Sequence, residues 1–461
     1  MSDVSDVSDP LGALYTTPEM VAIWSAEAHV RAMLAFEAAL AQAEARAGVI
    51  PAEAAAAIAS ACQVEAFDVV ALFREAAAAG TPAIPLVRML TERAAGDARG
   101  YVHWGATSQD AIDTALVLQM RAGLDLLISR LIATGELCAD LAQRYRETPM
   151  IGRTLLQQAL PITFGLKAAR WLAFCARLAR RLVEARDRIA VVQLGGAAGT
   201  LASLGPAGIP VTDALAAELG LAAPDLPWHT ERDRVAEVAA ALAIVAGGMA
   251  KIAHDLTLLA QTEVGEVSEA AGAGKGGSSA MPQKRNTVNA ALAQAAARLA
   301  LGVAPTILGA MAQEHERAVG GWQAEWEALP ALFRYTAGAV ERTHDALDGL
   351  EVDADRMRAN MASSHGLIMS ESLTMALAPQ VGRHEAFQLV RAATERARAA
   401  NIELRQAAEA DERIRSALST EQLDRAFDPA AYLGSASVYI DRALADFGAL
   451  RAQRMEGAPH A

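Results

Sequence analysis

The sequence predicts an all-α protein organised around a bundle of long helices. Aromatic residues make up only 5% of the 461 residues, whereas alanine and leucine, which favour helices over sheets, dominate the 53% that are hydrophobic. The apolar residues are concentrated in long segments that lack the alternation of a strand. These segments are 110–146, 161–191, 230–270, 287–318 and 324–350. A chain of this length and composition can bury a large core and form two or three domains.

The helical segments fall into three groups along the chain. Residues 1–109 predict short helices broken by turns, because Pro18 opens one segment and Pro51 follows the end of the next. Residues 110–353 contain the long segments, and residues 354–461 return to shorter amphipathic helices. We therefore expect an N-terminal helical domain, a central bundle domain and a C-terminal helical domain.

The long central segments are apolar on almost every face. In the first of them, Asp113, Arg121 and Asp125 are four or eight residues apart and share one narrow stripe of a helix. Helices of this kind bury one another only partly within one chain, so we expect a bundle shared between subunits. The uncharged runs 238–250 and 299–313 are shorter than the ~20 residues that span a bilayer, and we expect buried helices there.

The charge and cysteine content exclude several classes of function. The formal net charge of −13 argues against general binding of nucleic acid or of an anionic membrane. The first residues are acidic and polar, unlike a signal or transit peptide, and the three cysteines have no paired spacing. No zinc-ligand spacing or dinucleotide glycine pattern is present. We expect a cytoplasmic protein without a metal or cofactor, in which an anionic substrate would need a local cationic pocket.

Residues 277–286, with the sequence GSSAMPQKRN, are the most informative segment of the chain. They follow a glycine-rich run and separate two long helical segments. Residues of this kind do not contribute to a hydrophobic core. Glycines give a loop the freedom to close over a ligand, and Lys284 and Asn286 make this one cationic and polar. An ordinary surface connection would explain the glycines and serines but not the whole combination. We interpret the segment as a catalytic loop.

A second block, residues 103–114, stands at the start of the first long segment. Thr107 and Asp110 fit a capping box, and the unpaired amides of a helix N-terminus favour a carboxylate. A plain helix cap would explain Thr107 and Asp110, but it would not explain His103 or Ser108. We interpret His103 and Ser108 as functional.

A third block, residues 152–161, also precedes a long helical segment. Arg153 in this block is suited to a bidentate clamp on a carboxylate. Taken alone, an arginine here would more often be a surface charge.

The three blocks, in this order and at helix starts, resemble the signature regions of the fumarase/aspartase superfamily. Further stretches are similar to its 3-carboxy-cis,cis-muconate cycloisomerase branch: residues 84–87, 195–200, 228–233, 314–318 and 366–369. The resemblance implies a mostly helical, three-domain subunit and a homotetramer whose active sites are each assembled from three subunits. It also implies a cofactor-free reaction on a small polycarboxylate, in which a lactone closes as one carboxylate adds to a double bond and the neighbouring carbon is protonated.

The resemblance also implies the roles of individual residues. Ser278 would be the proton shuttle, with Lys284 and His103 as the other catalytic groups, because pre-aimed cations stabilise a doubly charged carboxylate. The residues implied in substrate binding are Thr107, Ser108, Arg153, Thr154, Gln158, His229, Arg232, Ser279, Met281, Asn286 and Arg317. For His229 and Arg232 a structural role is the alternative. For Arg317 a salt-bridge network between subunits is equally compatible with the sequence.

Leu155 is a departure that distinguishes the branches of the superfamily. Lyases that expel nitrogen usually carry a histidine at this position, because an amine leaving group needs a proton. A carboxylate, with a reference pKa of about 4, leaves without one. Leu155 therefore favours a cycloisomerase. The alternatives are a lyase of the adenylosuccinate or argininosuccinate type, a related epimerase, and a non-catalytic structural member.

Overall fold

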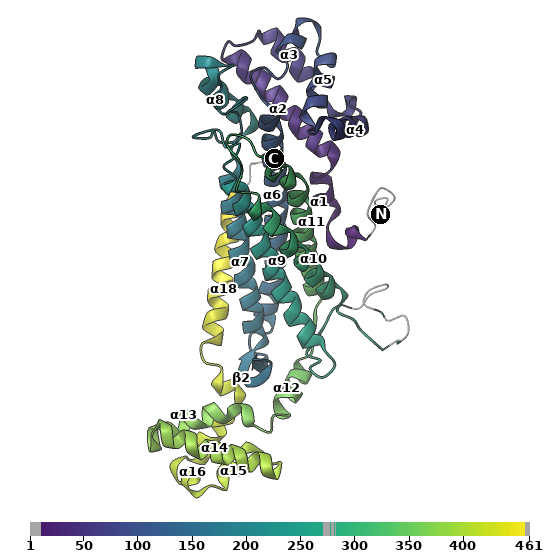
Figure 1. Cartoon of the computed structure of the whole chain (residues 1–461). Coiled ribbons are helices and arrows are strands. Elements are labelled where there is room, and N and C mark those ends of the chain that lie inside the picture. Colours follow the sequence, from purple (N-terminus) through teal and green to yellow (C-terminus); the bar gives the residue numbers. More distant parts are fainter. Residues whose placement is uncertain (1–10, 271–276, 278–280, 282, 457–461) are drawn as a thin grey trace. The chain divides into compact units, whose positions relative to one another are not determined.

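The structure is a computed structural model that describes residues 11–270, 277, 281 and 283–456. The predicted loop residues Ser278 and Ser279 lie outside the described residues. The predicted all-α class is confirmed, since each long apolar segment contains a long helix (Figure 1). These helices are α6 (Ser108–Arg144), α7 (Phe164–Ile189), α9 (Asp233–Ala260), α10 (Val288–Gly309) and α11 (Gly321–Leu347).

The chain divides into two compact units. The first unit comprises Met1–Leu131, Leu178–Ala250 and Leu292–Arg342, and the second comprises Ile132–Arg177, Lys251–Ala291 and Thr343–Ala461. Each long helix contributes residues to both units. The three-domain division expected from the sequence therefore stays a prediction.

The first unit adds short helices to its parts of the long ones. They are α1 (Pro18–Ile23), α2 (Ala26–Arg46), α3 (Ala52–Ala61), α4 (Val69–Ala79), α5 (Ala83–Arg93) and α8 (Gly208–Leu219). Their ends follow local rules: the Ser25 hydroxyl caps α2 at the amide of Ala28, and Gly80, with φ +74°, ends α4. Phe36 and Leu40 of α2 pack with Val211 of α8 in a buried apolar cluster.

The second unit contains the helices that follow α11. They are α12 (Ala354–Ala362), α13 (Ser370–Val381), α14 (Arg383–Ala400), α15 (Leu404–Glu409), α16 (Glu412–Ala417), α17 (Thr420–Ala426) and α18 (Ala436–Glu456). Leu377, Val390 and Leu404 belong to its buried cluster. The short antiparallel strands β3 (Val267–Ser268) and β4 (Glu351–Val352) also lie in this unit.

A β-hairpin in the second unit was not predicted. Strands β1 (Pro149–Thr154) and β2 (Gln157–Thr163) pair antiparallel, with Thr154 opposite Gln157. The two turn residues, Leu155 and Leu156, have φ values of +51° and +63°. Both positions of such a turn usually hold Asn or Gly, so a Leu-Leu pair gives no hairpin signal in the sequence.

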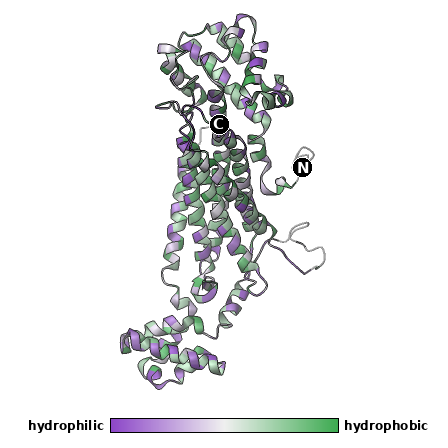
Figure 2. Cartoon of the chain, in the orientation of Figure 1, coloured by the Kyte–Doolittle hydropathy of each residue, from purple (hydrophilic) through white to green (hydrophobic). Residues whose placement is uncertain are grey.

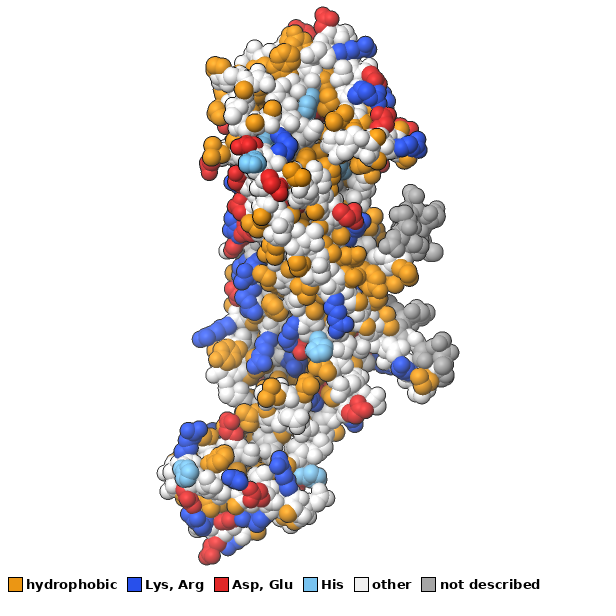
Figure 3. Space-filling view, in the orientation of Figure 1, with side chains coloured by type: hydrophobic (Ala, Val, Ile, Leu, Met, Phe, Trp, Pro, Cys, Tyr) orange, Lys and Arg blue, Asp and Glu red, His pale blue; other side chains and the backbone are white. Residues whose placement is uncertain are grey.

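The two uncharged runs, 238–250 and 299–313, differ in how much of the helix that contains them is buried. Helices α9 and α10 are both long and apolar enough to cross a membrane by length and composition alone, a test that core helices of soluble proteins also pass. The most apolar window of α9 is 61% buried, as expected for a core helix, but that of α10 is only 33% buried. The prediction of burial is therefore wrong for much of α10 within one chain. Figure 2 shows apolar residues along the long helices, and Figure 3 shows hydrophobic side chains exposed between charged ones.

Candidate active site

In the first unit, Asp110 connects three segments that are distant in the sequence. Its carboxylate accepts hydrogen bonds from the amides of Thr107, Gly195 and Gly196 at 2.9, 2.9 and 3.0 Å. The His229 Nε2 atom lies 2.7 Å from Asp110 Oδ1, and both side chains are buried. The bond from Thr107 confirms one half of the predicted capping box. Asp110 thus fixes the start of α6 against a glycine-rich turn and against His229.

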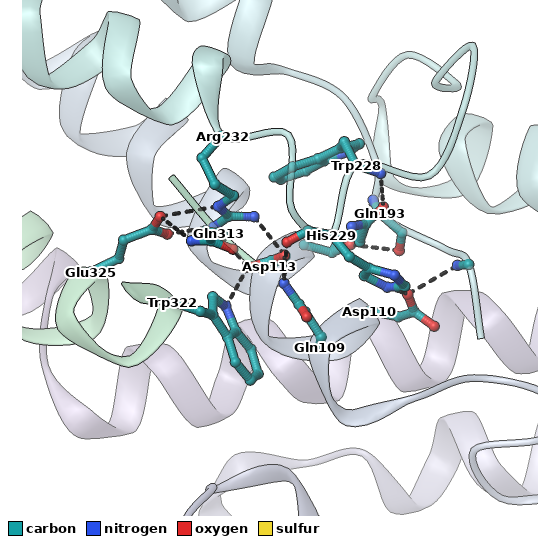
Figure 4. Close-up of polar contacts among 12 residues, drawn as sticks. Gln109, Asp110, Asp113, Gln193, Trp228, His229, Arg232, Gln313, Trp322 and Glu325 are labelled. Carbon is teal, nitrogen blue, oxygen red and sulfur yellow. Dashed lines mark hydrogen bonds and ion pairs between the residues drawn. The ribbon is translucent and has the colours of Figure 1, made fainter. Parts of the chain in front are cut away.

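A buried ion triad lies next to this cluster, also in the first unit (Figure 4). Arg232 donates to both oxygens of Asp113, at 2.8 and 3.1 Å, and its Nε donates to Glu325 at 3.0 Å. Trp322 Nε1 donates to Asp113 at 2.9 Å. Burial raises the pKa of Glu325, while Arg232 opposes the rise. Arg232 is 2% exposed and its guanidinium holds two carboxylates of its own chain, so its implied contact with substrate stays a prediction.

Arg317 reaches the same cluster from the turn between α10 and α11. It donates to Gln109 Oε1 and to the carbonyl of Ala197, both at 2.8 Å. Gln109 in turn donates to the carbonyl of His229 at 2.7 Å. Arg317 therefore holds the turn beside the residues that Asp110 organises, through neutral acceptors. The alternative for Arg317, a salt-bridge network between subunits, stays a prediction.

His103 lies just before α6 and contacts a carboxylate from another helix. Its Nδ1 atom is 2.6 Å from Oε1 of Glu37 on α2, and its backbone φ is +57°. Burial lowers the pKa of His103, but the charge and hydrogen bond of Glu37, with Asp110, outweigh it and raise the pKa overall. The surroundings of His103 thus favour its charged form more than water does, which suits a group that stabilises an anion.

The second unit holds Arg153 on β1. Its guanidinium makes a bidentate pair with the buried Glu266, at 2.9 and 2.7 Å. Glu266 also accepts from Asn360 Nδ2 at 2.8 Å. Thr154 and Gln158 lie beside Arg153 on the same hairpin and are exposed. Arg153 thus holds a carboxylate of its own chain, and its implied contact with a substrate carboxylate stays a prediction.

The end of the candidate catalytic loop lies against a cavity of about 670 Å³ in the second unit. Asn286 lines this cavity, while Lys284 and Met281 are exposed. Arg285 makes a bidentate pair with Glu351 of β4, at 2.8 and 2.9 Å. This pair anchors the chain where it leaves the loop.

The predicted residues therefore form two groups. The first unit brings together His103, Thr107, Ser108, His229, Arg232 and Arg317. The second unit holds Arg153, Thr154, Gln158, Met281, Lys284 and Asn286.

Sequence reasoning missed the buried acids that hold these residues. Glu37 lies seven residues before Glu44 on one face of α2, and this pairing of acids is a signal that could have found it. Glu266 and Glu325 gave no such signal, because the arginine that each one contacts is distant in the sequence.

Comparison with known proteins then identifies the family. A model of the lyase family matches residues 13–302, and a model of the adenylosuccinate lyase C-terminus matches residues 366–443. The chain belongs to the fumarase/aspartase superfamily of lyases. The resemblance stated from the sequence is confirmed.

Individual members of this superfamily are similar over nearly the whole chain. A 3-carboxy-cis,cis-muconate cycloisomerase of Pseudomonas aeruginosa is 50% identical over 453 residues, which cover 98% of each chain. The crystal structure of a 3-carboxy-cis,cis-muconate lactonizing enzyme from Pseudomonas putida, 44% identical, covers 95% of this chain and 99% of that one, with a TM-score of 0.89. A nitrosuccinate lyase of Streptomyces davaonensis is 42% identical and covers 93% of this chain and 92% of that one.

Proposed function

We propose that this chain is a 3-carboxy-cis,cis-muconate cycloisomerase. The observation that carries the proposal is the 50% identity with the Pseudomonas aeruginosa cycloisomerase over 98% of both chains. Leu155 supports it, because a leucine offers no proton to a nitrogen leaving group. The reaction is an isomerisation: one carboxylate of the substrate adds to the conjugated double bond, and the neighbouring carbon takes up a proton.

The residues supply what this reaction needs. The intermediate carries a second negative charge on a carboxylate, and pre-aimed cations lower its energy. His103, Arg153 and Lys284 are the cations, and Ser278 delivers the proton to carbon. The hydroxyl of Ser278 is too weak an acid on its own, so the charge of Lys284 and nearby amides must stabilise its alkoxide in a site closed to water.

The active form is a cytoplasmic homotetramer in which different subunits contribute to each site. Two observations support this part of the proposal. The predicted residues belong to two different compact units of the chain. Leu299, Leu301 and Leu308 on α10 are each about two-fifths exposed, and a neighbouring subunit would cover them. No nucleic acid or membrane takes part.

The proposal is tested by mixing the purified protein with 3-carboxy-cis,cis-muconate and following the loss of muconate absorbance. The expected result is rapid lactone formation, reduced by at least about 10³-fold in Ser278→Ala without loss of the tetramer. Adenylosuccinate, argininosuccinate and nitrosuccinate are the competing substrates. Turnover of one of them without muconate activity would overturn the proposal, and a near-normal rate in Ser278→Ala would place the proton shuttle elsewhere.

A further inference from the structure

Helix α2 buries two carboxylates on one face. Glu37 is 1% exposed and Glu44 is 0% exposed, and they are two turns apart on the helix. Oε1 of Glu37 contacts His103, whereas Oε2 of Glu37 and both oxygens of Glu44 have no hydrogen-bond partner among the described residues. Buried acids are costly unless they are paired or neutral, so this arrangement needs a reason.

The charges around His103 leave Glu37 as its counterion. The titratable groups that interact with the His103–Glu37 pair are Glu44 of α2, Asp110 of α6 and Cys62 at the end of α3. Burial, aided by the charge of Glu37, raises the pKa of Glu44 to about 9 and that of Cys62 to about 12, so both are neutral near pH 7. Asp110 is held by three backbone amides and His229.

The geometry of His103 fixes which nitrogen is available. Nδ1 contacts the buried carboxylate, while Nε2 has no partner within the part of the chain that the structure describes. The side chain is 15% exposed. A φ of +57° is unfavourable for a non-glycine residue, by about 1–2 kcal/mol, and such strain is retained where a side chain must point in one direction.

We propose that Glu37 is the positioning residue of His103: it holds Nδ1 and keeps the imidazolium form, so that Nε2–H is presented to a carboxylate of the substrate. The imidazolium then acts as a fixed positive donor rather than as a neutral ring of either tautomer. That Nε2–H binds a substrate carboxylate rests on the proposed function, whereas the pairing of Glu37 with His103 does not.

The pairing is tested first without substrate. Exchange of the His103 Cε1 hydrogen for deuterium, followed by mass spectrometry across pH, gives the pKa of this residue on its own peptide. In the wild-type protein we expect it above the ordinary histidine value. Glu37→Gln keeps an oxygen that accepts from Nδ1–H but removes the charge, and we expect the titration to move to lower pH. Glu44→Gln, on the same face of α2, should leave the titration in place. An ordinary or lowered value in the wild type, or no shift in Glu37→Gln, would overturn the proposal.

The pH dependence of turnover then separates positioning from simple structural support. In Glu37→Gln we expect kcat/KM for the muconate to fall by about tenfold or more at pH 8, with a deficit that shrinks as the pH falls and the imidazolium returns. Glu44→Gln should keep the wild-type profile. A loss of equal size at every pH would assign Glu37 a structural role only. If no muconate turnover occurs at all while the exchange results hold, the proposed function fails and the positioning role of Glu37 stands.

Discussion

At the scale of single residues, the acids that the structure buries decide what the candidate site residues can do. Arg232 illustrates this, because its guanidinium bridges Asp113 and Glu325 inside the first unit. In this environment we expect Arg232 to contribute through the shape of the site, and its contact with substrate stays a prediction.

Replacing Arg232 should therefore affect folding before it affects binding. Arg232→Met leaves two buried carboxylates without a partner, and we expect the free energy of unfolding to fall by about 3–5 kcal/mol. Urea denaturation followed by circular dichroism measures the change. A variant of normal stability with a raised KM would instead show that Arg232 binds substrate.

Glu44 should make the stability of the protein depend on pH. Its pKa of about 9 in the folded state lies above that of a carboxyl in the unfolded chain, about 4.3, so the folded state retains a proton that the unfolded state has released. The contribution of the protonated group is fully present below the unfolded value and is lost as the pH rises toward 9.

Glu44→Gln removes this loss. We expect the variant to match the wild type near pH 4.5 and to be more stable at pH 8, by on the order of 3 kcal/mol. Urea midpoints at the two pH values measure the difference. An advantage that does not grow with pH would show that Glu44 ionises normally in the folded protein.

At the scale of elements, the β1–β2 hairpin combines two unfavourable features. Its turn places Leu155 and Leu156 in the left-handed region, and these side chains are 96% and 74% exposed. Neither feature stabilises the hairpin. Because strain and exposed apolar surface coincide at this turn next to Arg153, we expect these leucines to make a contact that turnover requires.

Replacing the turn tests this interpretation. Leu155→Asn combined with Leu156→Gly suits positive φ at both positions, and we expect stability to rise by about 1–2 kcal/mol. We expect turnover of the muconate to fall, because the apolar contact is lost. Leu156→Gly alone, which keeps Leu155, separates relief of strain from loss of the contact. Full activity in the double variant would show that the leucines have no functional part.

At the scale of the whole molecule, the division of the predicted residues between two units makes assembly testable. His103 belongs to the first unit and Lys284 to the second. Suppose that each active site takes His103 from one subunit and Lys284 from another. A tetramer made of one variant alone then has a defect in every site. A tetramer that mixes the two variants contains some sites in which both residues are intact.

His103→Ala and Lys284→Ala should therefore complement each other. Each variant alone should be nearly inactive, and co-expression should restore about a quarter of the wild-type activity by random assembly of subunits. The double variant, co-expressed with either single variant, is the control that should stay inactive. No recovery in mixed tetramers would place both residues in sites formed within one subunit.

The sequence alone determined the helical class, the positions of the long helices and the superfamily. These follow from local patterns: alanine- and leucine-rich segments without alternation, and blocks of polar residues at helix starts. It also drew attention to His103, Arg153 and Lys284, because cations beside flexible or capped segments stand out in an acidic, apolar chain.

Only the tertiary structure decided how these residues are held. Glu37 meets His103 across 66 positions, and Glu266 meets Arg153 across 113. No local pattern encodes such pairs, because each is chosen by the packing of helices that are distant in sequence. The hairpin was hidden for a different reason, since its Leu-Leu turn adopts positive φ without the Asn or Gly that usually signals such a turn. The sequence thus named candidate cations, and the fold showed the carboxylates that His103 and Arg153 contact.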